Sequence, residues 1–88
     1  MTRAMTDPRR KKLLHRAQYR GFREADILIG GYARQALSAM SERELDAFEA
    51  LLTLNDHDIY SWIVGTSEPP ATIDAELIAR MRAFDAAK

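Results

Sequence analysis

The chain contains 88 residues, of which 47% are hydrophobic and 30% are charged, and its formal net charge is zero. This length favours a single domain, and the composition is that of a folded protein rather than of a disordered segment. Cysteine is absent, which excludes disulfides and thiol chemistry. No apolar run approaches the roughly 18 residues that a membrane span requires, so we expect no insertion into a membrane.

Basic and acidic residues are unequally distributed along the chain. Residues 1–23 hold eight Lys or Arg and one acid, which gives +7, whereas residues 24–88 hold five bases and twelve acids, which gives −7. We expect the two parts to neutralise each other; a protein partner and nucleic acid are the alternatives that a basic segment allows. The first ten residues lack the apolar stretch of a secretory signal. They are rich in arginine, as a mitochondrial presequence would be, but the first helix is expected to begin near Pro8 and leaves little room for one. We therefore expect a bacterial, cytoplasmic protein rather than one of the mitochondrial matrix.

Hydrophobic periodicity predicts helices and no strand. Apolar residues recur at three- and four-residue steps, and no segment alternates apolar and polar residues long enough for a sheet. We therefore expect an all-α fold, a small single-domain bundle of five short helices, with residues 1–8 as a flexible arm and residues 9–88 as the domain. The expected helices cover residues 8–19, about 22–39, from Ser41 to near Thr53, from Asn55 or Asp56 to Gly65, and from beyond Thr72 to the C-terminal residues.

Capping signals mark several of these boundaries. Ser41 and Glu44 have the spacing of a capping box, in which each side chain accepts a hydrogen bond from the other residue's backbone N–H. Asn55 or Asp56 can cap the fourth helix, and Gly65 ends it. Trp62 lies on the apolar side of that helix and is expected in the core.

Glycines at two places in the predicted helices require an explanation. Gly21 is expected to adopt the left-handed conformation that commonly closes a helix. Gly30 and Gly31 lie inside the second helix, where two glycines cost roughly 2 kcal/mol relative to alanine. We expect them to permit the close approach of another helix, with a bend in the second helix as the alternative.

Residues that could support catalysis are few. His57 stands between two aspartates, which suggests a metal site, but adjacent residues on a helix point in different directions and cannot converge on one ion. The sequence has neither a G-x-S-x-G elbow nor a glycine-rich phosphate loop. We therefore predict no catalytic residue and no metal site, and we expect a protein that is not an enzyme. Tyr60 is a candidate for a surface contact.

The segment Arg20-Gly21-Phe22-Arg23-Glu24 lies where the first two helices are expected to meet. A cation in the last turn of one helix and an acid in the first turn of the next both interact favourably with the helix dipoles. Arg20 and Glu24 could also form a surface ion pair, which is worth about 0–1 kcal/mol. From these residues alone, the segment is a well-capped connection between two helices.

The same segment, followed by Asp26, resembles the RGxxE signature of the succinate dehydrogenase flavinylation (assembly) factor family. Four further segments resemble, in order, its basic lead-in, its apolar stretch ending in Gly-x-aromatic-Ala, its F-x-x-L-L segment and its D-x-D-[IL]-[YF]-x-W-[IL] segment: residues 10–16, 27–33, 48–52 and 56–63. The resemblance covers about residues 9–70. RGxxE alone is weakly specific, whereas the ordered series is strongly specific.

Membership of this family implies a five-helix, non-enzymatic helper. It would bind the flavoprotein subunit of succinate dehydrogenase, or in some bacteria that of fumarate reductase, and promote covalent attachment of FAD to a histidine of that subunit. By this resemblance Arg20, Gly21 and Glu24 contact the client near its flavin, and this chain holds no FAD tightly itself. We expect the free protein to be a monomer.

The resemblance also suggests roles for individual side chains. Arg20 could offer its planar fork to a carboxylate or to carbonyl groups of the client, and Gly21 would let the client approach without a Cβ in the way. Glu24 would either accept a hydrogen bond from the client or orient Arg20. The remaining predicted partner-binding residues are Arg16 and Arg23, which would frame the contact, and Asp26, which would hold Arg23 or the first helix.

A different class of function remains as an alternative. The basic segment would also suit a small nucleic-acid-binding module or a regulatory helical module of the toxin–antitoxin type. Such a protein would lose affinity for DNA or RNA steeply as salt is raised.

Overall fold

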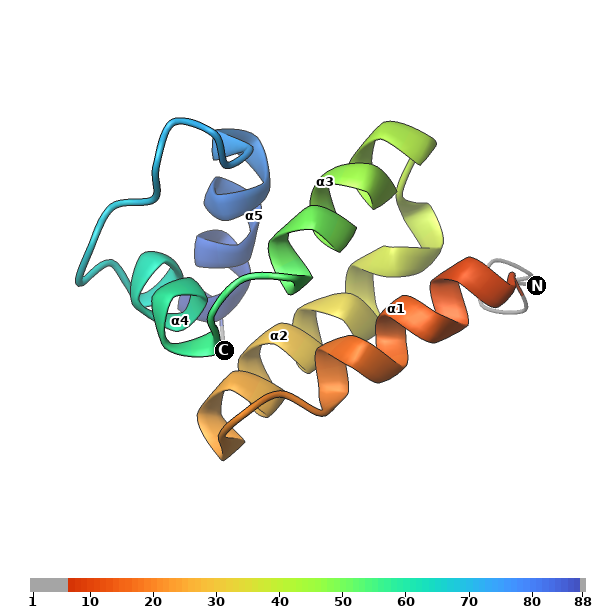
Figure 1. The fold of residues 1–88 in the computed structure, drawn as a ribbon, viewed down its shortest axis with the longest axis horizontal. Coiled ribbons are helices and arrows are strands. Elements are labelled where there is room, and N and C mark those ends of the chain that lie inside the picture. The colour runs from red at the N-terminus through yellow and green to blue at the C-terminus, as the bar shows by residue number, and fades with distance from the viewer. Residues whose placement is uncertain (1–6, 88) are drawn as a thin grey trace.

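The computed structural model describes residues 7–87, and these are all-α (Figure 1). Within this range the expected bundle of five helices is confirmed, and no strand is present. Residues 1–6 of the predicted flexible arm lie outside the described part of the chain. The elements are α1 (Pro8–Gln18), α2 (Arg23–Ala36), a 3-10 turn η2 (Leu37–Ala39), α3 (Glu42–Leu52), α4 (Asp56–Val64) and α5 (Ala75–Ala86).

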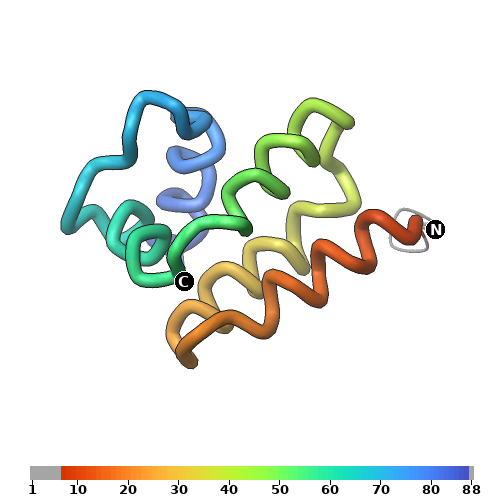
Figure 2. The backbone as a smooth tube through the Cα atoms, viewed as in Figure 1, coloured from red at the N-terminus to blue at the C-terminus, as the bar shows by residue number. Residues whose placement is uncertain are grey.

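Helix α2 lies at the centre of the bundle and contacts α1, α4 and α5. The chain reverses direction after α1, so that α1 and α2 run antiparallel and side by side (Figure 2). Helix α3 packs on α1 and α5, and α4 packs on α2 and α5. The connection between α1 and α2 and the start of α4 therefore lie at the same end of the molecule (Figure 1).

The predicted capping signals are confirmed in detail. Ser41 Oγ accepts a hydrogen bond from the Glu44 N–H at 3.1 Å, and Glu44 Oε1 accepts one from the Ser41 N–H at 2.7 Å. Asn55 caps α4, and Gly65 ends it with a φ of 90°. Asp74 caps α5 by accepting hydrogen bonds from the next turn. Each cap satisfies backbone groups that a helix end leaves without partners.

The end of the second helix differs from the sequence prediction. The second helix was expected to continue to Ala39, but α2 ends at Ala36 and the chain tightens into η2. Arg10 donates a hydrogen bond from Nε to the Leu37 carbonyl at 2.9 Å, and its Nη2 donates to the Met40 carbonyl. These carbonyls at the end of α2 are thus satisfied by α1 rather than by a longer helix.

The hydrophobic core draws on all five helices. Among the described residues the buried side chains are apolar. Trp62 is 8% exposed, which confirms its predicted place in the core. The largest fully buried side chains are Leu13, Ile29, Leu37, Leu45, Phe48, Leu51, Ile59 and Met81.

The two glycines of α2 permit close packing, as predicted. A Cβ on Gly30 would lie 3.1 Å from the Gln18 Cα and 3.3 Å from the Ala17 carbonyl oxygen, both in the backbone of α1. A Cβ on Gly31 would lie 3.2 Å from Phe84 Cζ, the tip of a side chain on α5. Gly30 therefore allows the backbones of α1 and α2 to approach, which fixes the end of α1 against α2.

Candidate functional site

Residues 19–22 join α1 to α2, and we call these residues together with the first two of α2, that is residues 19–24, the corner. Helix α1 ends at Gln18, one residue earlier than expected, and Phe22 is extended before α2 begins. The prediction that Gly21 is left-handed was wrong, because Gly65 is the residue with positive φ in the described part of the chain. Gly21 must therefore serve the corner in another way.

The side chain of Arg20 points into the protein and binds Asp56. Its Nε and Nη2 both lie 2.7 Å from Asp56 Oδ1, and the Arg20 side chain is only 9% exposed. Nη2 also donates to the Leu52 carbonyl at 2.8 Å, and Nη1 to the Arg16 carbonyl at 3.2 Å. One guanidinium thus satisfies carbonyls at the ends of α1 and α3 and a carboxylate at the start of α4, a task for which its several fixed donors are suited.

Asp56 explains why residue 21 is glycine. Asp56 Oδ2 accepts a hydrogen bond from the Gly21 N–H at 2.6 Å. A Cβ on Gly21 would lie 2.7 Å from that same oxygen, which is closer than a carbon and an oxygen can pack. We refer to Arg20, Gly21 and Asp56 as the Arg20–Asp56 cluster.

Asp26 stabilises the corner from α2. Its Oδ1 accepts a hydrogen bond from the Arg20 N–H. Of the two roles considered for Asp26, the structure therefore favours holding the end of α1 over pairing with Arg23. Arg16 lies 3.9 Å from Glu49 of α3, so it is also used within the chain.

Glu24 and Arg23 have a different environment. Both are exposed in the first turn of α2, and neither forms an ion pair or a side-chain hydrogen bond within residues 7–87. The surface pair between Arg20 and Glu24 is not formed, and it is Asp56 rather than Glu24 that orients Arg20. The corner thus holds Arg20 inside and leaves Glu24 and Arg23 available to a partner.

Aromatic packing joins the corner to α4. The Phe22 ring stacks on His57 with centroids 4.3 Å apart and an interplanar angle of 8°, and Tyr60 meets the same ring edge-on at 5.4 Å. No three His, Cys, Asp or Glu residues among those the structure describes are arranged to hold a metal ion. His57 thus serves as a packing partner of Phe22.

The basic segment is paired in part with the acidic part of the chain, through Arg9, Arg16 and Arg20. Arg9 binds Glu42, Asp46 and Glu49 of α3 at 3.1, 2.7 and 2.8 Å. The hydrogen bonds that Arg9 donates to Asp46 and Glu49 raise its pKa further above the ordinary value. Such pairing removes much of the positive charge that a nucleic acid would require.

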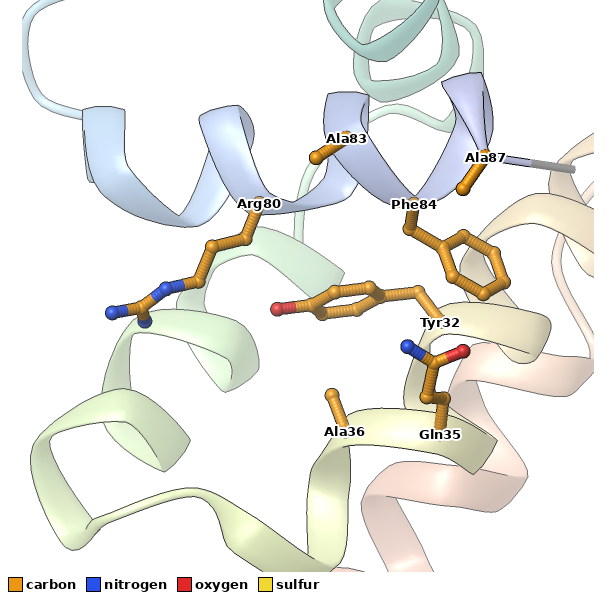
Figure 3. Close-up of a pocket in the computed structure, with 7 residues that line it drawn as sticks. All are labelled: Tyr32, Gln35, Ala36, Arg80, Ala83, Phe84 and Ala87. Atoms are coloured by element: carbon orange, nitrogen blue, oxygen red, sulfur yellow. The ribbon is translucent and has the colours of Figure 1, made fainter.

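The largest groove lies elsewhere, between α2 and α5 (Figure 3). Its volume is about 530 Å³, and the Tyr32 hydroxyl points along it towards Arg80. Burial raises the pKa of Tyr32. None of the corner residues lines this groove, and no pair of its side chains forms a nucleophile and a base. The groove is lined by Tyr32, Gln35, Ala36, Arg80, Ala83, Phe84 and Ala87.

Asp56 binds the corner from α4, and the sequence did not predict this contact. The sequence indicated Asp56 only as a possible cap for α4, and it lies 35 positions after Gly21. The one available signal was its place at the start of the segment 56–63, which resembles a family segment.

Comparison with known proteins shows the family to which the sequence is similar. A family described as "Flavinator of succinate dehydrogenase" matches residues 11–85. "Succinate dehydrogenase assembly factor 2, mitochondrial" of Candida glabrata is 32% identical over 82 residues, which are 89% of this chain and 54% of that protein. The protein of the same name from Danio rerio is 35% identical over 80 residues, 89% of this chain and 51% of that protein.

The chain spans about half the length of these curated relatives. Their names place them in mitochondria, which differs from the bacterial cytoplasm expected from the sequence. No helix within residues 7–87 is long and apolar enough to cross a membrane. The family match covers most of the chain and includes the whole corner, and the chain therefore belongs to the flavinator of succinate dehydrogenase family.

Proposed function

We propose that this chain is a non-enzymatic assembly factor that binds the flavoprotein subunit of succinate dehydrogenase and promotes covalent attachment of FAD to it. The observation that carries this proposal is the family match over residues 11–85, which runs through the corner and the start of α4. The names of the relatives, succinate dehydrogenase assembly factors, support the same role.

In this proposal some residues maintain the geometry of the corner and others contact the client. Arg20, Gly21 and Asp56 fix the chain between α1 and α2, because their groups bond to one another and to helix ends. Glu24 and Arg23 then project from a rigid first turn and contact the client. Arg20 acts through Asp56 rather than by touching the client, since its guanidinium donors are directed inward.

The reaction itself would take place within the client. FAD and the histidine that it modifies both belong to the flavoprotein, so FAD is the client's cofactor and is not held tightly by this chain. A helper increases the yield of covalently attached FAD only if it binds the conformation of the client that can react more tightly than the client's other conformations. A rigid corner suits that task, because less conformational entropy is lost when a preorganised surface binds.

Several finer expectations remain predictions. Fumarate reductase is a second possible client, and a bacterial cytoplasm is the proposed location. The free chain is expected to be a monomer.

Removal of the gene tests the proposed function directly. The flavoprotein subunit from the deletion strain is separated under denaturing conditions, and its covalently bound flavin is measured by fluorescence. We expect the covalent flavin to fall strongly and to return when this chain is expressed again. Unchanged covalent flavin in the deletion strain would refute the proposal.

A further inference from the structure

Not all the cations of α1 and α2 are used within the protein. Four arginines bond to acids or backbone carbonyls of the chain: Arg9, Arg10, Arg16 and Arg20. Four other cations are exposed and form no ion pair or side-chain hydrogen bond within residues 7–87: Lys11, Lys12, Arg23 and Arg34. Among the Lys and Arg residues that the structure describes, those that remain available are therefore confined to α1 and α2, except for Arg43 on α3.

These four cations lie on the exposed sides of two helices that pack against each other, α1 and α2. Gly30 packs on Gln18, and Arg10 bonds to the Leu37 carbonyl, so the two contacts fix the antiparallel register of α1 and α2. Arg34 lies between these levels on α2, beside the turn of α1 that carries Lys11. Lys11 and Lys12 are exposed on α1 and Arg34 is exposed on α2, so all three belong to the solvent-facing sides of these two neighbouring helices.

Exposed apolar side chains lie in the corner and on α2. Tyr19 is 69% exposed and Ile27 is 50% exposed, the two highest values among the large hydrophobic side chains described. Tyr19 is supported by His15, whose ring lies 4.7 Å away. Tyrosine and arginine are enriched among the residues that contribute most to binding in protein interfaces.

We infer that this outer face binds an acidic surface of the flavoprotein subunit, continuing the contact that begins at Glu24. The outer face consists of Lys11, Lys12, Tyr19, Arg23, Ile27 and Arg34. This inference rests on the proposed function for the identity of the partner. Apolar residues would pack next to the corner, and the client's carboxylates would lie opposite the cations farther along α1.

The composition of the outer face favours a protein over other polyanions. Glu24 adjoins the outer face and would repel phosphates, while Ile27 offers nothing to a phosphate backbone. The whole chain has no net charge, so it gains little from general attraction to a nucleic acid or an anionic membrane. A pattern of apolar contacts bordered by charges is the usual anatomy of a protein–protein interface.

Charge reversal tests the electrostatic part of the inference. The variants are Lys12→Glu and, as a matched control, Arg43→Glu. Arg43 is an exposed, unpaired cation on α3, so the control variant changes the charge of the protein by the same amount. Association with the purified flavoprotein subunit is followed by stopped flow at low and moderate salt. We expect Lys12→Glu to slow association about three- to ten-fold at low salt and to weaken its salt dependence, with Arg43→Glu close to wild type.

A second pair of variants tests the apolar part. Ile27→Ser removes an exposed side chain from the outer face, and Val64→Ser removes one that is 38% exposed at the end of α4. We expect Ile27→Ser to raise the dissociation rate about five-fold, since the complex would no longer bury the apolar Ile27 side chain. Val64→Ser should leave the dissociation rate unchanged.

The outcomes separate this inference from the proposed function. If the wild-type chain does not bind the flavoprotein subunit, both fail. If it binds but the two members of each pair behave alike, the outer face is not part of the interface and only the inference is overturned. Salt-sensitive binding of duplex DNA, or of vesicles containing anionic lipid, that Lys12→Glu abolishes would assign the outer face to that partner and overturn the inference as well.

Discussion

Asp56 serves three donors of the corner with two oxygens: Nε and Nη2 of Arg20 bind one, and the Gly21 N–H binds the other. The Asp56 side chain is 20% exposed, so these bonds lie partly away from water. Hydrogen bonds that involve a charged group are stronger in such surroundings than in water, and a donor left without its partner is correspondingly costly. The geometry of the corner therefore depends on a carboxylate from α4.

Gly21→Ala should destabilise the protein because its Cβ would displace Asp56. We expect a loss of about 1–2 kcal/mol in the free energy of unfolding, from weakened charged hydrogen bonds. In an Asp56→Ala background the same change should cost almost nothing, since the obstructing oxygen is gone. Urea unfolding of the four proteins measures both costs. Equal costs in the two backgrounds would mean that Gly21 matters for a reason other than Asp56.

The roles of single residues in the corner were only partly predictable from the sequence. The resemblance to the family singled out Arg20, Gly21 and Glu24. The neighbouring sequence did not indicate which of these side chains would be buried and which exposed. Gly21 was interpreted as a left-handed helix terminator because a glycine after a helix usually is one. Its actual neighbour is a side chain 35 positions away, and no local rule reports such a contact.

At the level of helices, the adjacent glycines of α2 provide a matched comparison. Alanine at either position should gain about 1 kcal/mol of helix propensity. At Gly30 the new Cβ meets the backbone of α1, which cannot move without separating the helices, whereas at Gly31 it meets the tip of Phe84, which can rotate. Overpacking at position 30 should cost about 1–3 kcal/mol and outweigh the gain.

We therefore expect Gly30→Ala to lower the melting temperature and Gly31→Ala to leave it unchanged or raise it. Thermal unfolding followed by circular dichroism checks the prediction. If both substitutions stabilise the protein, then α1 and α2 are not in the close contact described here.

The capping box of α3 predicts a dependence of stability on pH. The Ser41 backbone N–H, helped by Arg80, holds the pKa of Glu44 below its ordinary value of 4.5. A carboxyl whose pKa is lowered by folding contributes stability above its unfolded pKa, and that contribution is lost as pH falls through the folded pKa. Glu44→Ala should therefore be less stable than wild type at neutral pH, and the difference should shrink below pH 4.5.

Urea unfolding of both proteins at pH about 7 and about 3 measures this change. A difference that stays constant across this range would show that the Glu44 charge does not contribute to the cap.

Helices and their ends were largely predictable because their signals are local. Ser41 and Glu44 are three residues apart, and Asn55 lies directly before the turn that it caps. The end of α2 was missed because the carbonyls there bond to Arg10, on another helix. Local signals therefore predicted the beginnings of the helices and the end of α4 at Gly65, whereas the end of α2 involves a contact with another helix.

For the whole molecule, the sequence predicted the class of fold and the neutralisation of charge, but not the arrangement of the helices. The basic start of the chain was expected to pair with the acidic remainder, and Arg9 meets three acids of α3. Neither the periodicity nor the loop lengths indicated that α4 would lie against the corner. That contact brings together two segments, 20–24 and 56–63, that resemble the family separately.

The arrangement of the whole molecule leaves groups available on α1, on α2 and at the corner between them. Arg20 and Arg16 are used within the protein, while Glu24, Arg23 and the outer face remain exposed around the end of α1. The central claim is that Glu24 contacts the flavoprotein from a corner whose geometry other residues maintain. Loss of the Glu24 side chain should therefore weaken binding without weakening the fold.

Binding of the purified flavoprotein subunit to Glu24→Ala is the most direct test, with Glu76→Ala as the control. Both glutamates are exposed at the second position of a helix, α2 and α5 respectively, so both variants lose the same interaction with a helix dipole. We predict that Glu24→Ala binds about 30-fold more weakly or worse, as when one partner of an interfacial charge pair is removed, while both variants melt near the wild-type temperature. If Glu24→Ala binds the flavoprotein as tightly as Glu76→Ala does, the account of the corner as the docking site is wrong.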